Sequence, residues 1–423
     1  MATSRFYDFS GVRQVFANRN FAIYAVGNSI SLTGLWVQRL AVGWLAWELT
    51  HSGLWLGAVA FADLFPVMVL GLFGGVLADR YDRRAILIAG QSLALVQAVL
   101  LWALTGLSLI GIWPLFGLAL VQGIVVAGIQ PARLSLIPEL VREADLSGAV
   151  AIGAVIFNIA RFVGPAIAGV LISAFGVATA FGFNALTYVA LIAALLAIHI
   201  KPRPPRRGAR ESALSAVGSG VAYAFRHRSI APVLLFMAAV SLLPRPALEL
   251  LPGFADAVFV SGAGGLALLT SSTGLGALAA GLWLAQRKST TGLTTVALNG
   301  GFLAGAAIGV FAATHQIWIA ALSLTLAGFA VASLGVSTQT LIQAGVPDAM
   351  RGRVLSIWGL LLRGVPALGA LLMGWLSDFF GLQPPVLGAV ALYFAVMLWL
   401  NRRRVAIAGL EAGPSTGGTQ PER

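Results

Sequence analysis

A small set of ionisable side chains stands inside long apolar stretches of this sequence, where a charge is costly to bury. Arg39 and Asp63 each lie twelve residues from His51. If the stretches on either side of His51 form neighbouring helices, the two side chains lie at similar depth. We therefore expect an ion pair or a hydrogen-bonded contact between Arg39 and Asp63.

Arg245 and Glu249 form a second pair, four residues apart and therefore on one face of a helix. Pro244 and Pro246 flank Arg245, and each proline removes a backbone hydrogen-bond donor. We expect a broken helix here that lines a cavity and flexes. A kink in an otherwise packed helix is the alternative.

Arg161 and Arg363 complete the set, which then holds four arginines and two carboxylates. A cavity built from these residues is net positive and suits an anionic substrate, for example a catecholate siderophore. Each arginine has the alternative of bridging helix carbonyls or a carboxylate. Asp63 and Glu249 are the candidates for carrying a coupled proton, with a structural ion pair as the alternative. Further cavity candidates are polar or aromatic: Gln38, Asn158 and Trp358.

These residues need a scaffold, and the composition indicates a membrane protein. Of 423 residues, 58% are hydrophobic and 10% are charged, against roughly 25% charged in a soluble domain. A helix needs about 20 mostly apolar residues to cross a bilayer. Twelve segments qualify, near residues 20–48, 54–78, 85–108, 112–132, 148–174, 178–200, 230–252, 263–286, 293–313, 316–341, 354–377 and 383–401. We therefore expect an all-α integral membrane protein with 12 transmembrane helices.

The basic residues follow the connections between these segments. Of the 27 Lys and Arg residues, 23 fall on one side of the predicted topology, four lie inside segments and none lies on the other side. The positive-inside rule then predicts that both termini lie in the cytoplasm. The formal net charge of +12 reflects contact with anionic lipid headgroups, and we expect no nucleic-acid partner.

A polar stretch that begins with "KPRPPRRGARE" divides the chain into two sets of six segments. We expect a cytoplasmic N-terminal segment, a six-helix bundle, a cytoplasmic linker, a second six-helix bundle and a cytoplasmic tail. Their bounds are 1–19, 20–200, 201–229, 230–401 and 402–423. Apolar residues at helical spacing predict an amphipathic helix over 212–226 on the membrane surface, and a linker without a helix is the alternative.

The two halves are related in sequence. The stretch "GPAIAGVLISAFG" (164–176) aligns without gaps with "GALLMGWLSDFFG" (369–381) at an offset of 205 residues. A duplicated six-helix unit predicts two pseudo-symmetric halves, with a binding site between them near the middle of the membrane.

Residues 75–84, "GVLADRYDRR", place a cluster of charges between the second and third segments. They resemble the loop signature of the major facilitator superfamily, except that Asp82 stands where the signature has glycine. The matching positions are Gly75, Asp79, Arg80, Arg83 and Arg84. The resemblance implies the major facilitator fold. It also implies that Asp79, with the three arginines as charge-relay partners, contacts the start of the eleventh segment near Arg351 and Arg353 and closes the cytoplasmic side in the outward-facing state.

Four further stretches resemble the bacterial drug and siderophore exporter branch of this superfamily: "ELTHSGLWLGAV", "QPARLSLIPELV", "ARFVGPAIAG" and "VPDAMRGRVLSIWG". The third contains Gly164, Pro165 and Gly169, a short form of a Gly-Pro stretch linked to proton-driven exporters, with Ala160 in place of an earlier glycine. Small residues at this spacing also pack membrane helices generally. The resemblance implies a secondary active transporter of the bacterial inner membrane that exports a small amphipathic drug or siderophore in exchange for protons, by alternating access.

The sequence lacks the residue patterns that the common enzyme classes need. The chain has no cysteine and four scattered histidines, and it shows no Walker loop, HExxH motif or nucleophile elbow. We therefore expect no enzyme, no metal site and no cofactor. The expected partners are a small-molecule substrate, protons and membrane lipids, and the expected state is a monomer. A lysophospholipid or lipid flippase and a non-transporting sensor or scaffold of the same fold are the alternatives.

Overall fold

The computed structural model describes residues 10–199, 222–224, 227–287 and 289–411. The described elements are helices joined by short turns. The amphipathic helix expected over 212–226, and most of the expected linker, lie outside the described residues.

The first half of the molecule is a bundle of long helices. Its elements are α1 (Ser10–Phe16), α2 (Arg19–Thr50), α3 (Gly53–Arg80), α4 (Arg83–Gly106), α5 (Ile112–Leu140), a short 3-10 turn (Glu143–Asp145), α6 (Leu146–Phe175) and α7 (Val177–Ala197). Their lengths suit membrane crossing, since a helix rises 1.5 Å per residue and the apolar core of a bilayer is about 30 Å thick.

The second half repeats this arrangement with two interruptions. Its elements are α9 (Ile230–Leu242), the 3-10 helix η2 (Arg245–Leu250), α10 (Leu251–Gly253), the π-helix η3 (Phe254–Val258), α11 (Gly262–Ala285), α12 (Leu293–Ala313), α13 (Ile317–Gly345), α14 (Asp348–Arg363), α15 (Val365–Phe380), α16 (Gln383–Arg402) and α17 (Arg404–Ala408). In the described chain, eleven stretches are long and apolar enough to span a membrane. The helix α2 is the twelfth candidate, which agrees with the predicted all-α fold of 12 transmembrane helices.

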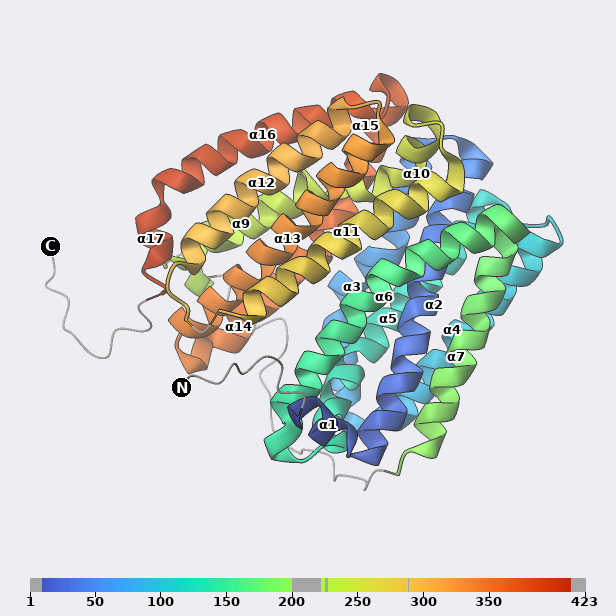
Figure 1. Cartoon of the computed structure of the whole chain (residues 1–423), viewed down its shortest axis with the longest axis horizontal. Helices are drawn as coiled ribbons and strands as arrows, with labels where there is room; N and C mark the ends of the chain where they lie inside the picture. The colour runs from blue at the N-terminus through green and yellow to red at the C-terminus, as the bar shows by residue number, and fades with distance from the viewer. Residues whose placement is uncertain (1–9, 200–221, 225–226, 288, 412–423) are drawn as a thin grey trace, which may run out of the picture.

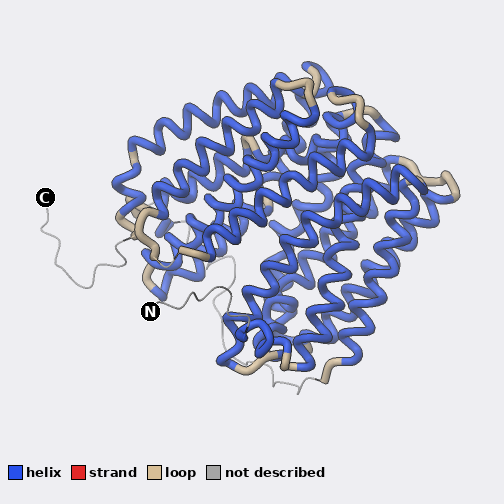
Figure 2. The backbone as a smooth tube through the Cα atoms, in the orientation of Figure 1, coloured by secondary structure: helices blue, strands red, loops and turns tan. Residues whose placement is uncertain are grey.

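The two halves lie side by side and pack together at one end (Figure 1). Contacts between them join α3 to α15 and α6 to α11. We call this end, with the turns at His51, Gly176 and Gly381, the joined end. The halves diverge toward the opposite end, which carries α1 and α17, and we call that the split end (Figure 2).

Equivalent glycines of the internal repeat make equivalent contacts within each half. A Cβ added to Gly164 of α6 would lie 2.5 Å from the Cβ of Trp36 on α2. A Cβ added to Gly369 of α15 would lie 2.4 Å from Cγ of Pro246 on η2. Both glycines therefore allow the fifth helix of a half to pack closely against its first helix, as small residues do in membrane proteins.

The next glycine of each repeat packs across the interface between the halves. A Cβ added to Gly169 of α6 would lie 2.3 Å from the Cβ of Ala267 on α11. A Cβ added to Gly374 of α15 would lie 2.2 Å from the carbonyl oxygen of Gly53 on α3. The duplication inferred from the sequence is thus present in the packing, and Gly164 and Gly169 are helix-packing residues around the buried Pro165.

Candidate functional site

Three charged side chains from both halves meet between α2, α3 and η2. One guanidinium nitrogen of Arg39 lies 3.6 Å from a carboxylate oxygen of Asp63 and 3.6 Å from one of Glu249. Asp63 belongs to the first half and Glu249 to the second. The side chains are 35%, 25% and 26% exposed, respectively, so all three remain accessible from the space between the halves. The ion pair expected between Arg39 and Asp63 is confirmed.

The expectation that Arg245 and Glu249 share one helix face is wrong. Residues four apart share a face in an α-helix, whereas a 3-10 helix has three residues per turn and separates them. The segment Arg245–Leu250 is a 3-10 helix, because Pro244 and Pro246 cannot donate backbone hydrogen bonds. Glu249 is thereby directed to Arg39. The break expected in this helix is confirmed.

Arg245 instead contacts the backbone where α14 ends and α15 begins. Its guanidinium donates a hydrogen bond to the carbonyl oxygen of Leu362. In a continuous helix that carbonyl would accept from the residue four positions later, which here is Pro366 and has no N–H. Arg245 therefore supplies the donor that the proline removes, which is the structural alternative for this arginine.

Trp36 of α2 lies between two cations. Its ring centroid is 5.5 Å from the guanidinium carbon of Arg39 and 5.7 Å from that of Arg161 on α6. Phe157 packs edge-on against the same ring at 5.9 Å. Cation–π contacts of this kind hold a guanidinium without neutralising its charge, so Arg161 remains a full positive charge beside the Arg39 cluster.

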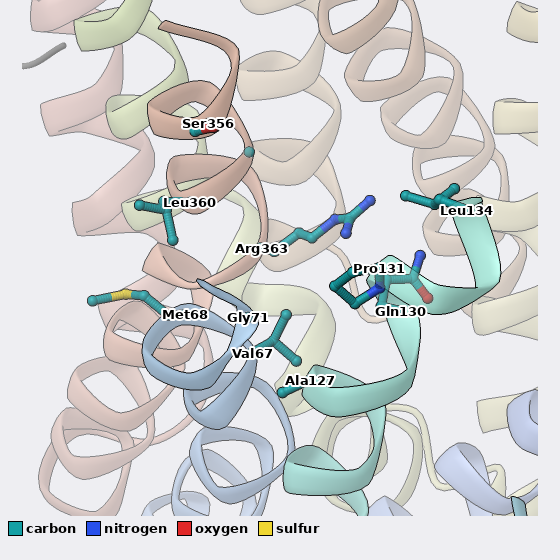
Figure 3. Close-up of a pocket in the computed structure, with 11 residues that line it drawn as sticks. Val67, Met68, Gly71, Ala127, Gln130, Pro131, Leu134, Ser356, Leu360 and Arg363 are labelled. Carbon is teal, nitrogen blue, oxygen red and sulfur yellow. The ribbon is translucent and has the colours of Figure 1, made fainter. Parts of the chain in front are cut away.

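A cavity of about 240 Å³ opens between α3 and α5 of the first half and α14 of the second. Figure 3 shows the guanidinium of Arg363 extending from α14 toward α5 across this space. The lining is otherwise mostly apolar: Val67, Met68, Gly71, Ala127, Gln130, Pro131, Leu134, Ser356, Gly359 and Leu360. The cavity lies one to two turns of α3 from Asp63, toward the split end.

The four arginines fall into two groups by their contacts. Arg39 has two carboxylate partners and Arg245 a carbonyl partner. Within the described part of the chain, Arg161 and Arg363 have neither an ion pair nor a hydrogen bond. Among the described residues, these two arginines therefore have no carboxylate in ion-pair contact, and Arg161 is held by its cation–π contact with Trp36.

Gln38 and Trp358 do not line this space, contrary to expectation. Gln38 is 2% exposed; it donates to Gln97 at 3.0 Å and accepts from Asn184 at 2.8 Å, inside the first half. Trp358 is 8% exposed and donates to the hydroxyl of Thr338 at 3.1 Å, inside the second half. Both carry a polar group that needs a buried partner, and each finds it within its own bundle.

Asn158 is half-buried on α6, one turn before Arg161. Its amide donates to the carbonyl oxygen of Ala154 of the same helix at 2.8 Å. The structure therefore places it near the candidate site and gives it no contact with another helix among the described hydrogen bonds.

The loop-signature arginines bind within the first half. Arg83 forms an ion pair with Glu139 at the end of α5. Arg84 donates to the carbonyl oxygens of Leu195 at 2.5 Å and Leu196 at 2.9 Å, which are carbonyls of the last turn of α7 and lack helical partners. These contacts tie the start of α4 to two neighbouring helices of its own half.

Asp82 is compatible with the turn in which the signature has glycine. Its φ is −60°, so no left-handed backbone is required. Its carboxylate accepts a hydrogen bond from the backbone N–H of Ala85 at 2.7 Å, as an N-cap residue does. The side chain of Asp79 and the surroundings of Gly75 lie outside the described part of the chain, while Arg80 ends α3 at the split end and is exposed.

Two residues that line the cavity were not predicted from the sequence. Met68 and Gln130 line the cavity. The signal for Gln130 was the polar Gln-Pro step inside an apolar segment. Met68 carried no signal, because a methionine in an apolar helix looks the same on any face.

Comparison with protein-family models places residues 12–416 in a family described as transmembrane secretion effectors. The staphyloferrin A transporter of Staphylococcus aureus is 28% identical over 351 residues, which cover 82% of this chain and 87% of that protein. The enterobactin exporter of Shigella boydii is 28% identical over 382 residues, 87% of each chain.

Solved structures agree on the fold. A nucleoside transporter superposes with a TM-score of 0.67 at 14% identity, covering 91% of this chain and 98% of the other. A POT family transporter crystallised with a thioalcohol-conjugated peptide gives a TM-score of 0.72 at 13% identity, covering 92% and 96%. At sequence identities of 13–14%, this similarity shows a shared arrangement of helices and nothing about the substrate.

Proposed function

Because this chain belongs to the transmembrane secretion effector family of major facilitator transporters, we propose that it exports an amphipathic anion in exchange for protons. The observation that carries the proposal is the position of Arg39 between Asp63 of one half and Glu249 of the other. A group that bridges the halves through protonatable partners can link a proton to their relative movement. Alternating access of the space between the halves is part of the same proposal.

A proton on either carboxyl changes what holds Arg39. Protonated Glu249 loses its attraction for Arg39, and the charged bridge between the halves is released. Protonated Asp63 leaves Arg39 to Glu249 and strengthens that bridge. Exposed and half-exposed ion pairs are individually weak, about 0.2–1 kcal/mol. Neither the state with the Arg39–Glu249 bridge nor the state without it is therefore stabilised so strongly that the transport cycle stops there.

The substrate class follows from the two arginines, Arg161 and Arg363, that form no ion pair or hydrogen bond among the described residues. Four arginines and two carboxylates give the candidate site a net charge of +2 when all are ionised. Arg161 and Arg363 are free to bind acidic groups, and the apolar lining around Met68 and Leu360 suits a hydrocarbon or aromatic body. The named relatives transport siderophores, so an acidic siderophore-like molecule is the first substrate to test.

The direction of transport rests on the distribution of charge. We place the split end in the cytoplasm, since the basic residues of the chain gather on that side and the positive-inside rule applies to them. The cavity beside Arg363 then faces the cytoplasm in this structure, and the joined end closes the outer side of a bacterial inner membrane. This is the state that would load a substrate for export.

The test is substrate-induced proton movement in proteoliposomes with an imposed pH gradient. Purified protein is reconstituted with a pH-sensitive dye, and catecholate and carboxylate siderophores, macrolides, cationic dyes and lysolipids are added in turn. The proposal predicts proton flux with acidic amphipathic compounds. Flux only with cationic dyes would contradict the substrate class, while lysolipid movement without protons would support a flippase. Silence with every compound, from folded protein, would favour a sensor or scaffold.

A further inference from the structure

At the joined end, a carboxylate of the second half caps a helix of the first half. Asp378 of α15 accepts hydrogen bonds from the backbone N–H groups of Gly53 at 2.6 Å and Leu54 at 3.3 Å, at the start of α3. The hydroxyl of Ser52, the N-cap residue of α3, donates to the same carboxylate at 2.7 Å. The first N–H groups of a helix have no partner within the helix and form its positive end, so a carboxylate suits this position.

The local sequence around Asp378 does not explain an acidic residue there. Asp378 lies in the last turn of α15 (Val365–Phe380), and a negative charge at the C-terminal end of a helix is electrostatically unfavourable. The contact with α3 offsets that penalty. Among the described contacts, the compensating partners of Asp378 all belong to the other half of the molecule.

Close backbone packing brings Asp378 within reach of α3. A Cβ added to Gly57 would lie 2.3 Å from the carbonyl oxygen of Ala370, and one added to Gly374 would lie 2.2 Å from that of Gly53. The helices α3 and α15 therefore touch backbone to backbone at this end. If the halves separate here, the three hydrogen bonds to Asp378 break together.

The internal repeat shows that the charge is specific to this position. At the repeat offset of 205 residues, Asp378 corresponds to Ser173 of α6. Ser173 lies beside Gly264, near the start of α11, where its hydroxyl is 4.0 Å from a Cβ built on that glycine. The equivalent helix start in the second half thus faces a neutral hydroxyl, whereas the start of α3 is capped by a charge across the interface.

We propose that Asp378 is a positioning residue that latches the joined end shut and sets how often the transporter opens there. The inference rests on the alternating access proposed above. The latch is intact in this structure, in which the halves meet at the joined end and diverge at the split end (Figure 1). Removing the charge shifts the balance toward the state that is open at the joined end, while the site around Arg39 is left unchanged.

The test is a distance measurement between spin labels in the full-length protein. The chain contains no cysteine, so cysteines introduced at Leu107 and His315 report on the joined end without background labelling. A second pair at Glu143 and Ala285 reports on the split end. Double electron–electron resonance is recorded in nanodiscs for the parent protein and its variants.

Asp378→Asn is expected to raise the ratio of open to closed joined ends about fivefold or more, in line with the loss of a charged helix cap. Asp378→Glu restores most of the closed population. Glu48→Gln is the matched control, because Glu48 is an exposed carboxylate near the same end with no hydrogen bond or ion pair among the described residues. It should leave the ratio unchanged.

Gly57→Leu separates failure of the latch from failure of alternating access. A side chain at Gly57 overlaps the backbone of α15 and forces the joined end apart by sterics alone. If Gly57→Leu lengthens the joined-end distance and Asp378→Asn does not, the latch is refuted and alternating access stands. If neither variant changes the distance at either end, both the latch and alternating access are overturned.

Discussion

Arg39 and Glu249 lie 3.6 Å apart although they belong to different halves of the molecule. The same guanidinium lies at an equal distance from Asp63 in its own half. One cation therefore has one carboxylate partner on each side of the interface. If the halves separate near η2, Arg39 keeps its ion pair with Asp63 and loses the one with Glu249. The joined and the separated conformation then differ by this one ion pair.

Arg39→Gln should abolish pH-driven transport while leaving the protein folded. The substitution keeps a polar but shorter side chain and leaves Asp63 and Glu249 without their cation. Transport is measured in proteoliposomes, and folding by thermal unfolding in detergent. Arg39→Lys is the control, since it retains the charge and should keep part of the activity. A wild-type transport rate in Arg39→Gln would show that the cluster has no role in transport.

Arg161→Gln and Arg363→Gln should weaken substrate binding. Each removes a cation that forms no ion pair or hydrogen bond among the described residues, so we expect the loss to fall on the substrate. We expect KM for an acidic substrate to rise about tenfold in each, which corresponds to about 1.4 kcal/mol. Arg287→Gln, an exposed arginine at the split end, should leave KM unchanged. Equal KM values in all three variants would remove Arg161 and Arg363 from the binding site.

Gln38→Leu should destabilise the first half without changing KM. Gln38 is buried, and its loss leaves the carbonyl oxygen of Gln97 and the amide of Asn184 without their partner. A buried polar group left unpaired costs about 1–3 kcal/mol, visible as a lower unfolding temperature. Asn158→Ala serves for comparison, because the Asn158 amide bonds only to its own helix. A raised KM with unchanged stability would show that Gln38 contributes to substrate binding and not to the stability of the first half.

Glu411, which follows α17, contacts the start of α12, and we expect acid to weaken this contact. Its carboxylate accepts from the backbone N–H groups of Gly292 at 2.8 Å and Thr294 at 2.7 Å, at the start of α12. Burial raises the pKa of Glu411, but the hydrogen bonds from Thr294 and Gly292 outweigh it and hold the pKa below the ordinary value of 4.5. A depressed pKa stabilises the folded state above the ordinary value, and this contribution is lost as the pH falls through the lower, folded-state pKa.

The measurement is the unfolding temperature of the parent protein and of Glu411→Gln between pH 7 and pH 4. The parent should be the more stable by a constant margin down to about pH 4.5, and the margin should shrink below it. A margin that grows on acidification would mean that the carboxylate does not cap α12 in its ionised form.

The sequence predicted those parts of the site that depend on local constraints. Arg39 and Asp63 meet because they are equidistant from one short turn, and two neighbouring helices then fix their depth. Gly164 and Gly169 could be read as helix-packing residues from their small-residue spacing, which was the alternative to an exporter motif, and their close contacts agree with that alternative. In each case, spacing along one or two adjacent helices was sufficient.

The remaining features depend on which face of a helix is turned inward. In a membrane span both faces are largely apolar, so hydrophobic periodicity does not separate the cavity from the bundle interior. Gln38 and Trp358 were misplaced for this reason. The partner of Glu249 depended on a 3-10 helix whose extent the prolines alone did not define, and Asp378 gained its role from a contact with a helix more than 300 residues away in sequence.

We propose that Asp63 and Glu249 couple protons to transport through Arg39. This proposal is tested most directly by comparing two assays of Asp63→Asn and Glu249→Gln in proteoliposomes, with Glu48→Gln as the control. The first assay is substrate accumulation driven by a pH gradient, and the second is exchange of labelled for unlabelled substrate at equal pH. We expect both variants to lose gradient-driven accumulation and to retain exchange. Gradient-driven accumulation at the wild-type level in both variants would contradict it.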